Sequence, residues 1–201
     1  NIFNEEKLDN IISKKDICIN LVGILYENKK NSFENIHINF PSLISKICEK
    51  HKLKQFIHLS ALGIDKAKDS NYAKSKLKGE KNVTNNFPSA TILRPSVIYS
   101  VDDNFTTNIM TLLNLFPFFP LYYNGETKFS PMHVSDMSEI IYKIIDRNIC
   151  SETIECVGPE VMTFKEILEK LLILIDKKKI LIPLPLTMAK LVAFFLEKAP
   201  K

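Results

Sequence analysis

The sequence predicts an α/β protein whose first half is built on a parallel β-sheet. Three short apolar segments have the length of buried strands: 16–22, 55–59 and 90–94. Two segments with helical spacing of apolar residues, 33–52 and 71–85, separate them. Because strands that alternate with helices pair in parallel through right-handed crossovers, this order predicts a doubly wound sheet.

The first predicted strand and helix each carry a distinguishing feature. Segment 16–22 is a continuous apolar run that ends at Gly23, which predicts a strand buried on both faces. Pro41 interrupts the apolar pattern of segment 33–52. Since proline lacks an amide hydrogen, we expect a kink there or a later start of the helix.

The second half of the chain predicts a small C-terminal α/β lobe, so we expect two domains, 1–100 and 101–201. Ser135 is the expected N-cap of one helix of the lobe, and Thr163 with Glu166 forms a capping box for another. The aromatic, proline-containing segment 116–123 is expected to be a loop. The expected helices are 105–116, 135–147, 163–176 and 187–198, and the expected strands are 128–134, 153–157 and 179–182.

Composition excludes several classes of function. The chain has 201 residues, 45% hydrophobic and 25% charged, which is enough for a sizeable core. The net charge of +4 comes from scattered lysines without interleaved aromatic residues, so nucleic-acid binding is not expected. The four histidines lack metal-ligand spacing, and no metal is expected. We expect the four cysteines to be reduced thiols, and no apolar run is long enough to span a bilayer.

Ser60, Tyr72 and Lys76 are the candidate chemical groups. Ser60 ends a predicted strand, and ligands bind at that edge of open parallel sheets. Tyr72 and Lys76 are four residues apart on a predicted helix, and an ammonium about 4 Å from a phenol favours the phenolate by roughly 4 kcal/mol. Lys76 is therefore expected to lower the pKa of Tyr72 toward the range that acid–base catalysis needs, although burial opposes the shift. The alternative is a surface tyrosine–lysine pair, a spacing that Tyr26 and Lys30 also show.

Several segments in order carry a family resemblance. Ser60-Ala-Leu-Gly63, Asn71-Tyr-Ala-Lys-Ser-Lys-Leu-Lys-Gly-Glu80 and Ile92-Leu-Arg-Pro-Ser-Val97 resemble extended and atypical short-chain dehydrogenases. Later segments narrow the resemblance to the nucleotide-binding accessory subunits of respiratory complex I and their bacterial relatives. These are Ser100-Val-Asp-Asp-Asn-Phe105, Phe129-Ser-Pro-Met-His-Val-Ser-Asp136, Val157-Gly-Pro-Glu160 and Ile182-Pro-Leu-Pro185.

This resemblance implies a Rossmann-like fold. Residues 1–100 would be the C-terminal portion of an NAD(P)-binding domain whose N-terminal strands are absent, and 101–201 a substrate or partner lobe. Ser60, Tyr72 and Lys76 would match the family's catalytic residues, with Lys76 also holding the nicotinamide ribose. The implied cofactor-binding residues are Asn20, Leu21, Val22, Gly23, Ser60, Tyr72, Lys76, Pro95, Ser96 and Val97.

The resemblance favours NADP(H), with NAD(H) as the alternative, and leaves turnover open. The glycine-rich turn that binds the pyrophosphate is absent, because the five glycines of the chain cannot build it. The leading interpretation is an accessory or assembly component of NADH:ubiquinone oxidoreductase with mainly structural nucleotide binding. The alternatives are an active NAD(P)-dependent reductase or sugar-nucleotide epimerase, and a scaffold that binds no dinucleotide.

The apolar segment 184–195 bears on partners and location. It is too short to span a membrane and is favoured as a helix packed on the lobe. The alternative is a helix that contacts a respiratory-complex subunit or a membrane surface. The corresponding location is cytoplasmic, or peripheral on the inner face of the bacterial or mitochondrial inner membrane.

Overall fold

The structure is a computed structural model of the chain, and it describes residues 2–184. By internal contacts the chain divides into two compact units. Unit 1 comprises residues 1–96 and 135–156, and unit 2 comprises residues 97–134 and 157–201. The segment 135–156 therefore lies with the first unit, although the sequence placed it in the C-terminal lobe.

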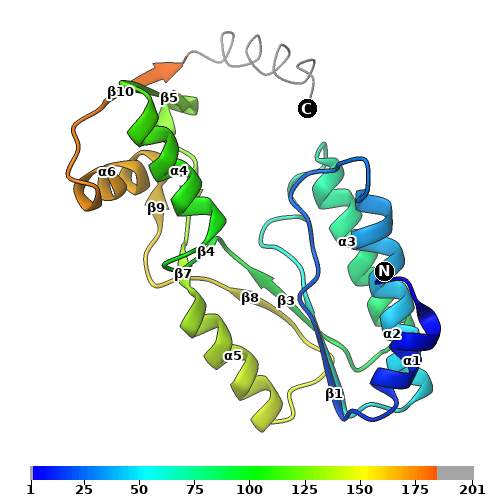
Figure 1. Cartoon of the computed structure of the whole chain (residues 1–201). Helices are drawn as coiled ribbons and strands as arrows, with labels where there is room; N and C mark the ends of the chain where they lie inside the picture. Colours follow the sequence, from blue (N-terminus) through cyan, green and yellow to red (C-terminus); the bar gives the residue numbers. More distant parts are fainter. Residues whose placement is uncertain (1, 185–201) are drawn as a thin grey trace. The chain divides into compact units, whose positions relative to one another are not determined.

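Unit 1 contains a four-stranded parallel sheet in the order β1-β2-β3-β8 (Figure 1). The central strands are the most buried, with Ile57 and Leu93 inaccessible to solvent. The prediction that the first strand is buried on both faces was wrong: β1 lies at an edge of the sheet, and Ile19 is 39% exposed. The strands are β1 (Ile17–Asn20), β2 (Gln55–Leu59), β3 (Thr91–Pro95) and β8 (Thr153–Cys156).

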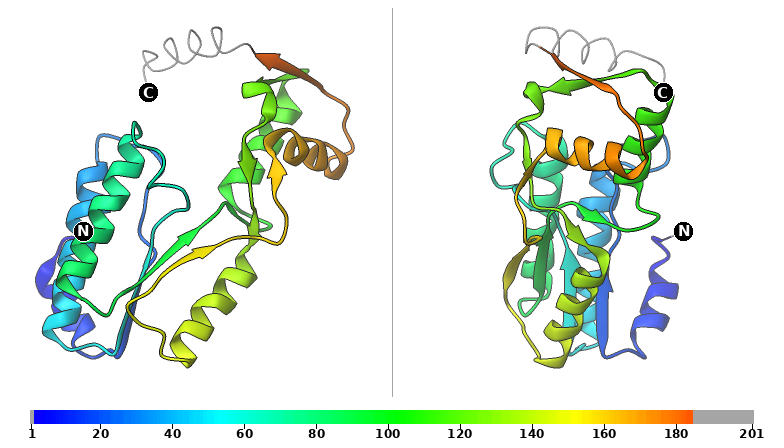
Figure 2. Two further views of the ribbon diagram at one scale, coloured as in Figure 1. Left: turned by 180° about the vertical axis from the view of Figure 1, so that it is seen from behind. Right: turned by 90° about the vertical axis from the view of Figure 1, so that its left-hand side faces the viewer.

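Helices cover both faces of this sheet. In Figures 1 and 2, α2 and α3 lie together on one side and α5 lies on the other. An apolar core joins α2 and α3 to the sheet, with Cys48, Phe56 and Val83 at its centre. The helices of unit 1 are α1 (Glu5–Ile12), the π-helix η1 (Glu34–Asn39), α2 (Phe40–Lys50), α3 (Asn71–Asn86) and α5 (Val134–Asp146).

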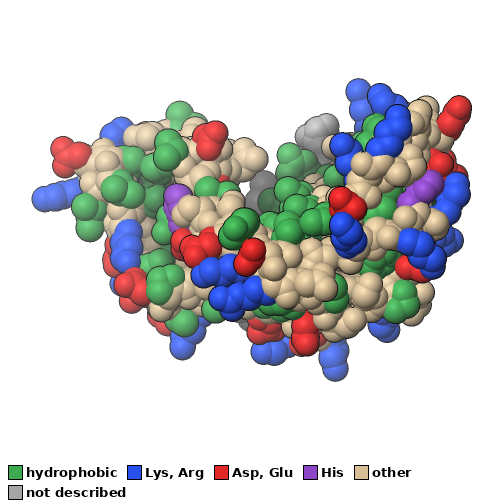
Figure 3. Space-filling model, turned by 90° about the horizontal axis from the view of Figure 1, so that it is seen from below, with side chains coloured by type: hydrophobic (Ala, Val, Ile, Leu, Met, Phe, Trp, Pro, Cys, Tyr) green, Lys and Arg blue, Asp and Glu red, His purple; other side chains and the backbone are tan. Residues whose placement is uncertain are grey.

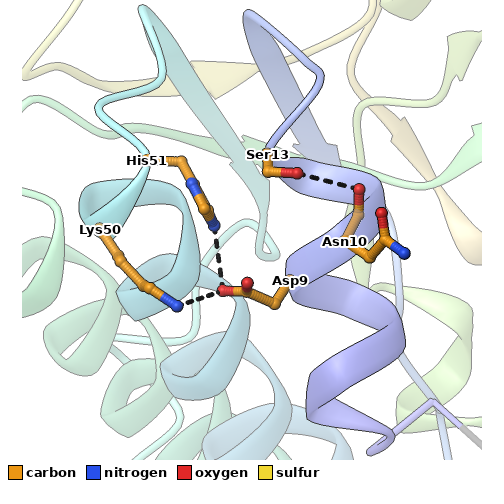
Figure 4. Close-up of polar contacts among 5 residues, drawn as sticks. All are labelled: Asp9, Asn10, Ser13, Lys50 and His51. Carbon is orange, nitrogen blue, oxygen red and sulfur yellow. Dashed lines mark hydrogen bonds and ion pairs between the residues drawn. The ribbon is translucent and has the colours of Figure 1, made fainter.

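Helix α1 was not predicted from the sequence. Asn4 caps it by accepting a hydrogen bond from the amide of Lys7, and Ile12 anchors it in the core. Polar contacts tie it to the end of α2 (Figure 4): Asp9 Oδ1 lies 2.7 Å from Lys50 Nζ and 3.0 Å from His51 Nε2. Lys50 and His51 hold the pKa of the Asp9 carboxyl below its ordinary value.

The predicted helix 33–52 is two helices of different type. The wide turns of η1 run into α2 at Phe40, and Pro41 lies in the first turn of α2, where its missing amide hydrogen costs nothing. Gly79 on α3 packs against this transition, and a Cβ built on Gly79 would lie 2.0 Å from the carbonyl oxygen of His37. Only glycine therefore allows α3 to approach η1 so closely.

Up to residue 184, unit 2 combines the α-helices α4 and α6 with short strands. Helices α4 and α6 pack through Ile109, Leu113 and Leu168, with Leu121 of β5 in the same core. The capping box of Thr163 and Glu166 at the start of α6 was predicted correctly. The elements are β4 (Ile98–Tyr99), α4 (Asn104–Leu115), β5 (Phe118–Tyr122), η2 (Tyr123–Gly125), β6 (Lys128–Phe129), β7 (Met132–His133), β9 (Met162–Thr163), α6 (Phe164–Leu174) and β10 (Ile180–Leu184).

Three sequence predictions in the second half need correction, and one cannot be assessed. Segment 116–123 is not a loop throughout, because it contains β5, which pairs in parallel with β10 in a two-stranded sheet that tolerates Pro120. Ser135 is not the N-cap of α5, which begins one residue earlier. Strand β8 joins the main sheet rather than the lobe. The predicted helix 187–198 lies outside the described residues.

Basic and acidic side chains are both scattered over the face shown in Figure 3. Within residues 2–184, no helix is long and apolar enough to cross a membrane. The same residues contain no group of three or more side chains placed to hold a metal ion.

Candidate functional site

Helix α3 presents Tyr72 and Lys76 on one side, one turn apart. Ser70 caps the helix by accepting a hydrogen bond from the amide of Ala73, which fixes where the first turn begins. Lys76 is only 6% exposed, and Tyr72 is half-buried. The pair is therefore not the exposed surface pair that was the alternative interpretation of the spacing.

The ammonium of Lys76 lies against the ends of two strands. Its Nζ donates to the carbonyl of Leu59, the last residue of β2, over 3.2 Å. A Cβ built on Gly23, just after β1, would lie 3.3 Å from the same nitrogen. Burial lowers the pKa of Lys76 to about 8, and the nearby carboxylate of Glu80 partly opposes that shift. An ammonium with two further donors is thus held beside the loop that follows β1.

Ser60 follows β2 directly and is buried. Its amide donates to the carbonyl of Leu93 on β3 over 2.7 Å, which locks its backbone to the sheet. Its hydroxyl oxygen has no hydrogen-bond partner among the described residues. Because buried polar atoms are nearly always paired, this hydroxyl is a candidate contact for a bound ligand or water.

His58 lies two residues before Ser60 on β2, and its protonation state follows from its contacts. The amide of Val22 donates to Asn20 Oδ1, so Asn20 Nδ2 is the donor toward His58 Nδ1, 3.0 Å away. The proton of the neutral ring is therefore on Nε2, which is buried without a partner among residues 2–184. Burial and the charge of Lys76 lower the pKa of His58 to about 3.

A second histidine connects η1 to α3. His37 Nε2 accepts from the amide of Ile24 over 3.1 Å, so Nδ1 carries the proton and donates to Ser75 Oγ over 2.9 Å. Ser75 in turn donates to the carbonyl of Tyr72 over 2.7 Å. Burial and the charge of Lys76 lower the pKa of His37 to about 4. The ring is thus neutral at pH 7, and it fixes the loop after β1 to the first turn of α3.

Two aromatic rings hold Tyr72 in place. Its ring meets that of His37 edge to face at 5.4 Å and that of Phe33 at 5.8 Å. Burial raises the pKa of Tyr72 above its ordinary value. This direction is opposite to the expected lowering by Lys76, and its cause is burial of the phenol.

The other predicted site residues differ in accessibility. Asn20 is buried through its bond to His58, whereas Leu21, Val22 and Gly23 are exposed. Pro95 and Ser96 lie at the end of β3, where the Ser96 amide donates to the carbonyl of Cys156 over 2.8 Å. Val97 is the first residue of unit 2 and belongs to a different body.

Sequence reasoning missed the two histidines and Ser75. His58 could have been recognised because strand residues two apart share a face, which places it beside Ser60. His37 gave no signal, because its position depends on the π-helical turn of η1.

These groups offer hydrogen-bond donors at the end of β2. The hydroxyl of Ser60 and the ammonium of Lys76 can both donate to ribose or carboxamide oxygens.

The fold is the α/β fold of NAD(P)-dependent sugar-nucleotide reductases and epimerases of known structure, with a parallel sheet covered on both faces. More particularly, the chain belongs to the RmlD substrate binding domain family, which matches residues 65–171, more than half of its length.

Curated relatives include the mitochondrial NADH-ubiquinone oxidoreductase 40 kDa subunit of Neurospora crassa, 30% identical over 198 residues. That match covers 98% of this chain and 52% of the relative. The mitochondrial NADH dehydrogenase (ubiquinone) 1 alpha subcomplex subunit 9 of Arabidopsis thaliana is 28% identical over 204 residues, covering 98% of this chain and 51% of the relative. The chain thus spans about half the length of these relatives.

Solved structures of low sequence identity share the fold. The dTDP-4-dehydrorhamnose reductase of Clostridium acetobutylicum has a TM-score of 0.77 at 18% identity, over 91% of this chain and 71% of that one. The UDP-glucuronic acid 4-epimerase of Bacillus cereus, in complex with UDP-glucuronic acid and NAD, has a TM-score of 0.76 at 21% identity. That match covers 92% of this chain and 67% of the epimerase chain.

Proposed function

We propose that this chain is part of an accessory subunit of NADH:ubiquinone oxidoreductase and binds a dinucleotide, favouring NADP(H), without turning over a substrate. The observation that carries the binding proposal is the buried Ser60 hydroxyl without a partner in residues 2–184, beside a buried Lys76 ammonium with donors to spare. The similarity to two named complex I subunits supports the assignment to that complex.

The state of Tyr72 disfavours one catalytic role. A general base acts in its deprotonated form, and burial raises the pKa of this phenol, which disfavours the phenolate. The packing of its ring on His37 and Phe33 makes Tyr72 a structural part of the site. An active reductase or epimerase is the second candidate, favoured by the shared face of Tyr72 and Lys76 on α3.

The proposed partners are other subunits of the respiratory complex or the membrane surface beside it. The apolar segment 184–195 is the proposed contact, and almost all of it lies outside the described residues. The proposed location is peripheral, on the inner face of the membrane that holds the complex.

Nucleotide binding is tested with the whole protein by calorimetric titration with NADPH and NADH. Lys76→Met and Ser60→Ala remove the two proposed contacts, and Lys74→Met on the exposed side of α3 is the matched control. Loss of a hydrogen bond from a charged group weakens binding by roughly 10- to 100-fold, so we expect that loss for Lys76→Met and none for Lys74→Met. Equal affinities of Lys76→Met and the unsubstituted protein would contradict the proposed site.

Turnover and assembly are tested with Tyr72→Phe. We expect this variant to retain NADPH and to migrate with the respiratory complex on native gels. Neither the variant nor the unsubstituted protein should oxidise NADPH. NADPH oxidation that requires the Tyr72 hydroxyl would instead establish the enzymatic alternative. If the protein carries no nucleotide after purification and binds none in titration, the remaining interpretation is a scaffold that binds no dinucleotide.

A further inference from the structure

Unit 2 contains a cavity that the proposed nucleotide site does not use. Its volume is about 500 Å³, within the range of small-molecule sites. Helix α4 contributes Phe105 and Met110, and helix α6 contributes Ile167, Leu171 and Leu174. The α6 residues recur at positions i, i+4 and i+7, so they form one apolar stripe along the helix. Most of the wall is therefore hydrocarbon.

A close backbone crossing builds one side of this cavity. Pro131 and Pro159 both line it, and the amide of Gly158 donates to the carbonyl of Ser130 over 3.0 Å. A Cβ built on Gly158 would lie 1.7 Å from the carbonyl oxygen of Pro131. Only glycine permits this crossing. The wall on this side of the cavity is therefore fixed by a close backbone contact as well as by side-chain packing.

Several polar side chains of the wall already have hydrogen-bond or ion-pair partners. The Ser100 hydroxyl donates to Asp102, and the Thr106 hydroxyl donates to Asp103. Lys170 is the one basic side chain in the described lining, and its Nζ lies 3.2 Å from Glu160 Oε2. A diphosphate entering this cavity would meet one basic side chain of the described lining, Lys170, and would compete for it with Glu160.

We propose that this cavity binds a single unbranched hydrocarbon chain of an amphiphile, with the polar head at the exposed Glu160–Lys170 pair. The apolar stripe of α6 would contact the chain along its length, and Leu174, which lines the cavity and is exposed, would contact the chain near solvent. The inference does not rest on the proposed nucleotide function, since none of the groups that carry it belongs to unit 1.

The test uses the whole protein and cis-parinaric acid, a straight-chain fluorescent fatty acid. We expect saturable fluorescence enhancement, reversed by saturated acids in the order octanoate, decanoate, dodecanoate. Each buried methylene is expected to raise affinity about fourfold. Oleate and oleoyl lysophosphatidylcholine distinguish a free acid from a phospholipid as the natural source. Displacement by oleate alone indicates the acid, and displacement by both indicates that the chain is recognised whatever its head group.

Two neighbouring residues of α6 give a matched pair of variants. Leu174 lines the cavity and is 76% exposed, whereas Ile173 does not line it and is 78% exposed. Leu174→Asp is expected to weaken probe binding at least about tenfold, because a carboxylate would meet the hydrocarbon chain. Ile173→Asp is expected to leave binding within about twofold. Met110→Trp, which fills the cavity from α4, is expected to reduce binding independently.

Three results would overturn the inference. Equal losses in Leu174→Asp and Ile173→Asp would mean that the probe adsorbs on the exposed apolar surface. Displacement by UDP-glucuronic acid at lower concentrations than dodecanoate would assign the cavity to a polar ligand. The absence of saturable binding would mean that no chain enters. Failure of all nucleotide titrations would leave this inference standing, because it would affect unit 1 alone.

Discussion

The two buried histidines of unit 1 predict a steep loss of stability in acid, and His37 offers the sharper test. The perturbation is His37→Gln, compared with the unsubstituted protein from pH 7.5 to pH 4.5. His37 is buried and neutral, and burial lowers its pKa to about 4 from an ordinary value of 6.5. As the pH falls below about 6.5, the unfolded chain takes up a proton on this ring while the folded chain does not.

The direction and size of the effect follow from this difference. The titration of His37 does not change the free energy of unfolding above about pH 7. That free energy falls as the pH drops from 6.5 toward 4. One proton bound only by the unfolded chain lowers the free energy of unfolding by about 1.4 kcal/mol per pH unit. His37 alone therefore accounts for at most about 3 kcal/mol of acid destabilisation, a large part of a typical folding free energy.

The assay is urea unfolding followed by circular dichroism at several pH values. His37→Gln loses two hydrogen bonds, so we expect a constant destabilisation at every pH. Its stability should fall less steeply in acid, by about 1.4 kcal/mol per pH unit between pH 6 and 4.5, because glutamine has no proton to bind. Parallel curves for the two proteins would refute the conclusion that His37 is buried in its neutral form.

Three further predictions concern close packing at two glycines and one ion pair. Gly79→Ala should destabilise the fold by about 1–3 kcal/mol in the same urea assay, because the added methyl meets the His37 carbonyl; a stabilisation of about 1 kcal/mol, as helix propensity alone predicts, would contradict this. Gly158→Ala should likewise lower the unfolding midpoint and reduce parinaric acid binding, and an unchanged midpoint would argue against the close crossing at Pro131. Glu80→Gln should cost about 1–3 kcal/mol, because it leaves the partly buried Arg94 guanidinium without its bidentate carboxylate. Replacing both residues by Met should recover most of that loss, and no recovery would mean that the ion pair is not its cause.

Elements with a strong local pattern were predicted well. Strand β2 and helix α3 lie within one residue of the predicted ranges, because apolar runs and 3.6-residue spacing report burial directly. The capping box of α6 depends only on two side chains three residues apart, so it too could be identified. The strand–helix order also predicts that Lys76 lies near the end of β2, where its Nζ donates to the carbonyl of Leu59.

Features that depend on distant parts of the chain could not be predicted. The exposure of Ile19 depends on which strands pair, and strand β5 exists only because residues 180–184 pair with it. Helix α1 is stabilised by contacts with residues 50 and 51, which its own short sequence does not reveal. The raised pKa of Tyr72 reflects the depth of the phenol in the fold, whereas spacing reports only its distance from a lysine.

The contact between Gly79 and the carbonyl of His37 makes two distant positions interdependent. The wide turn of η1 places a carbonyl against α3, and at that point α3 has room only for a residue without a side chain. In a homologue whose segment 34–39 winds as an ordinary α-helix, that carbonyl would move and position 79 would accept alanine or serine. Sequences that keep the wide turn should keep glycine, so the two features should be gained and lost together in evolution.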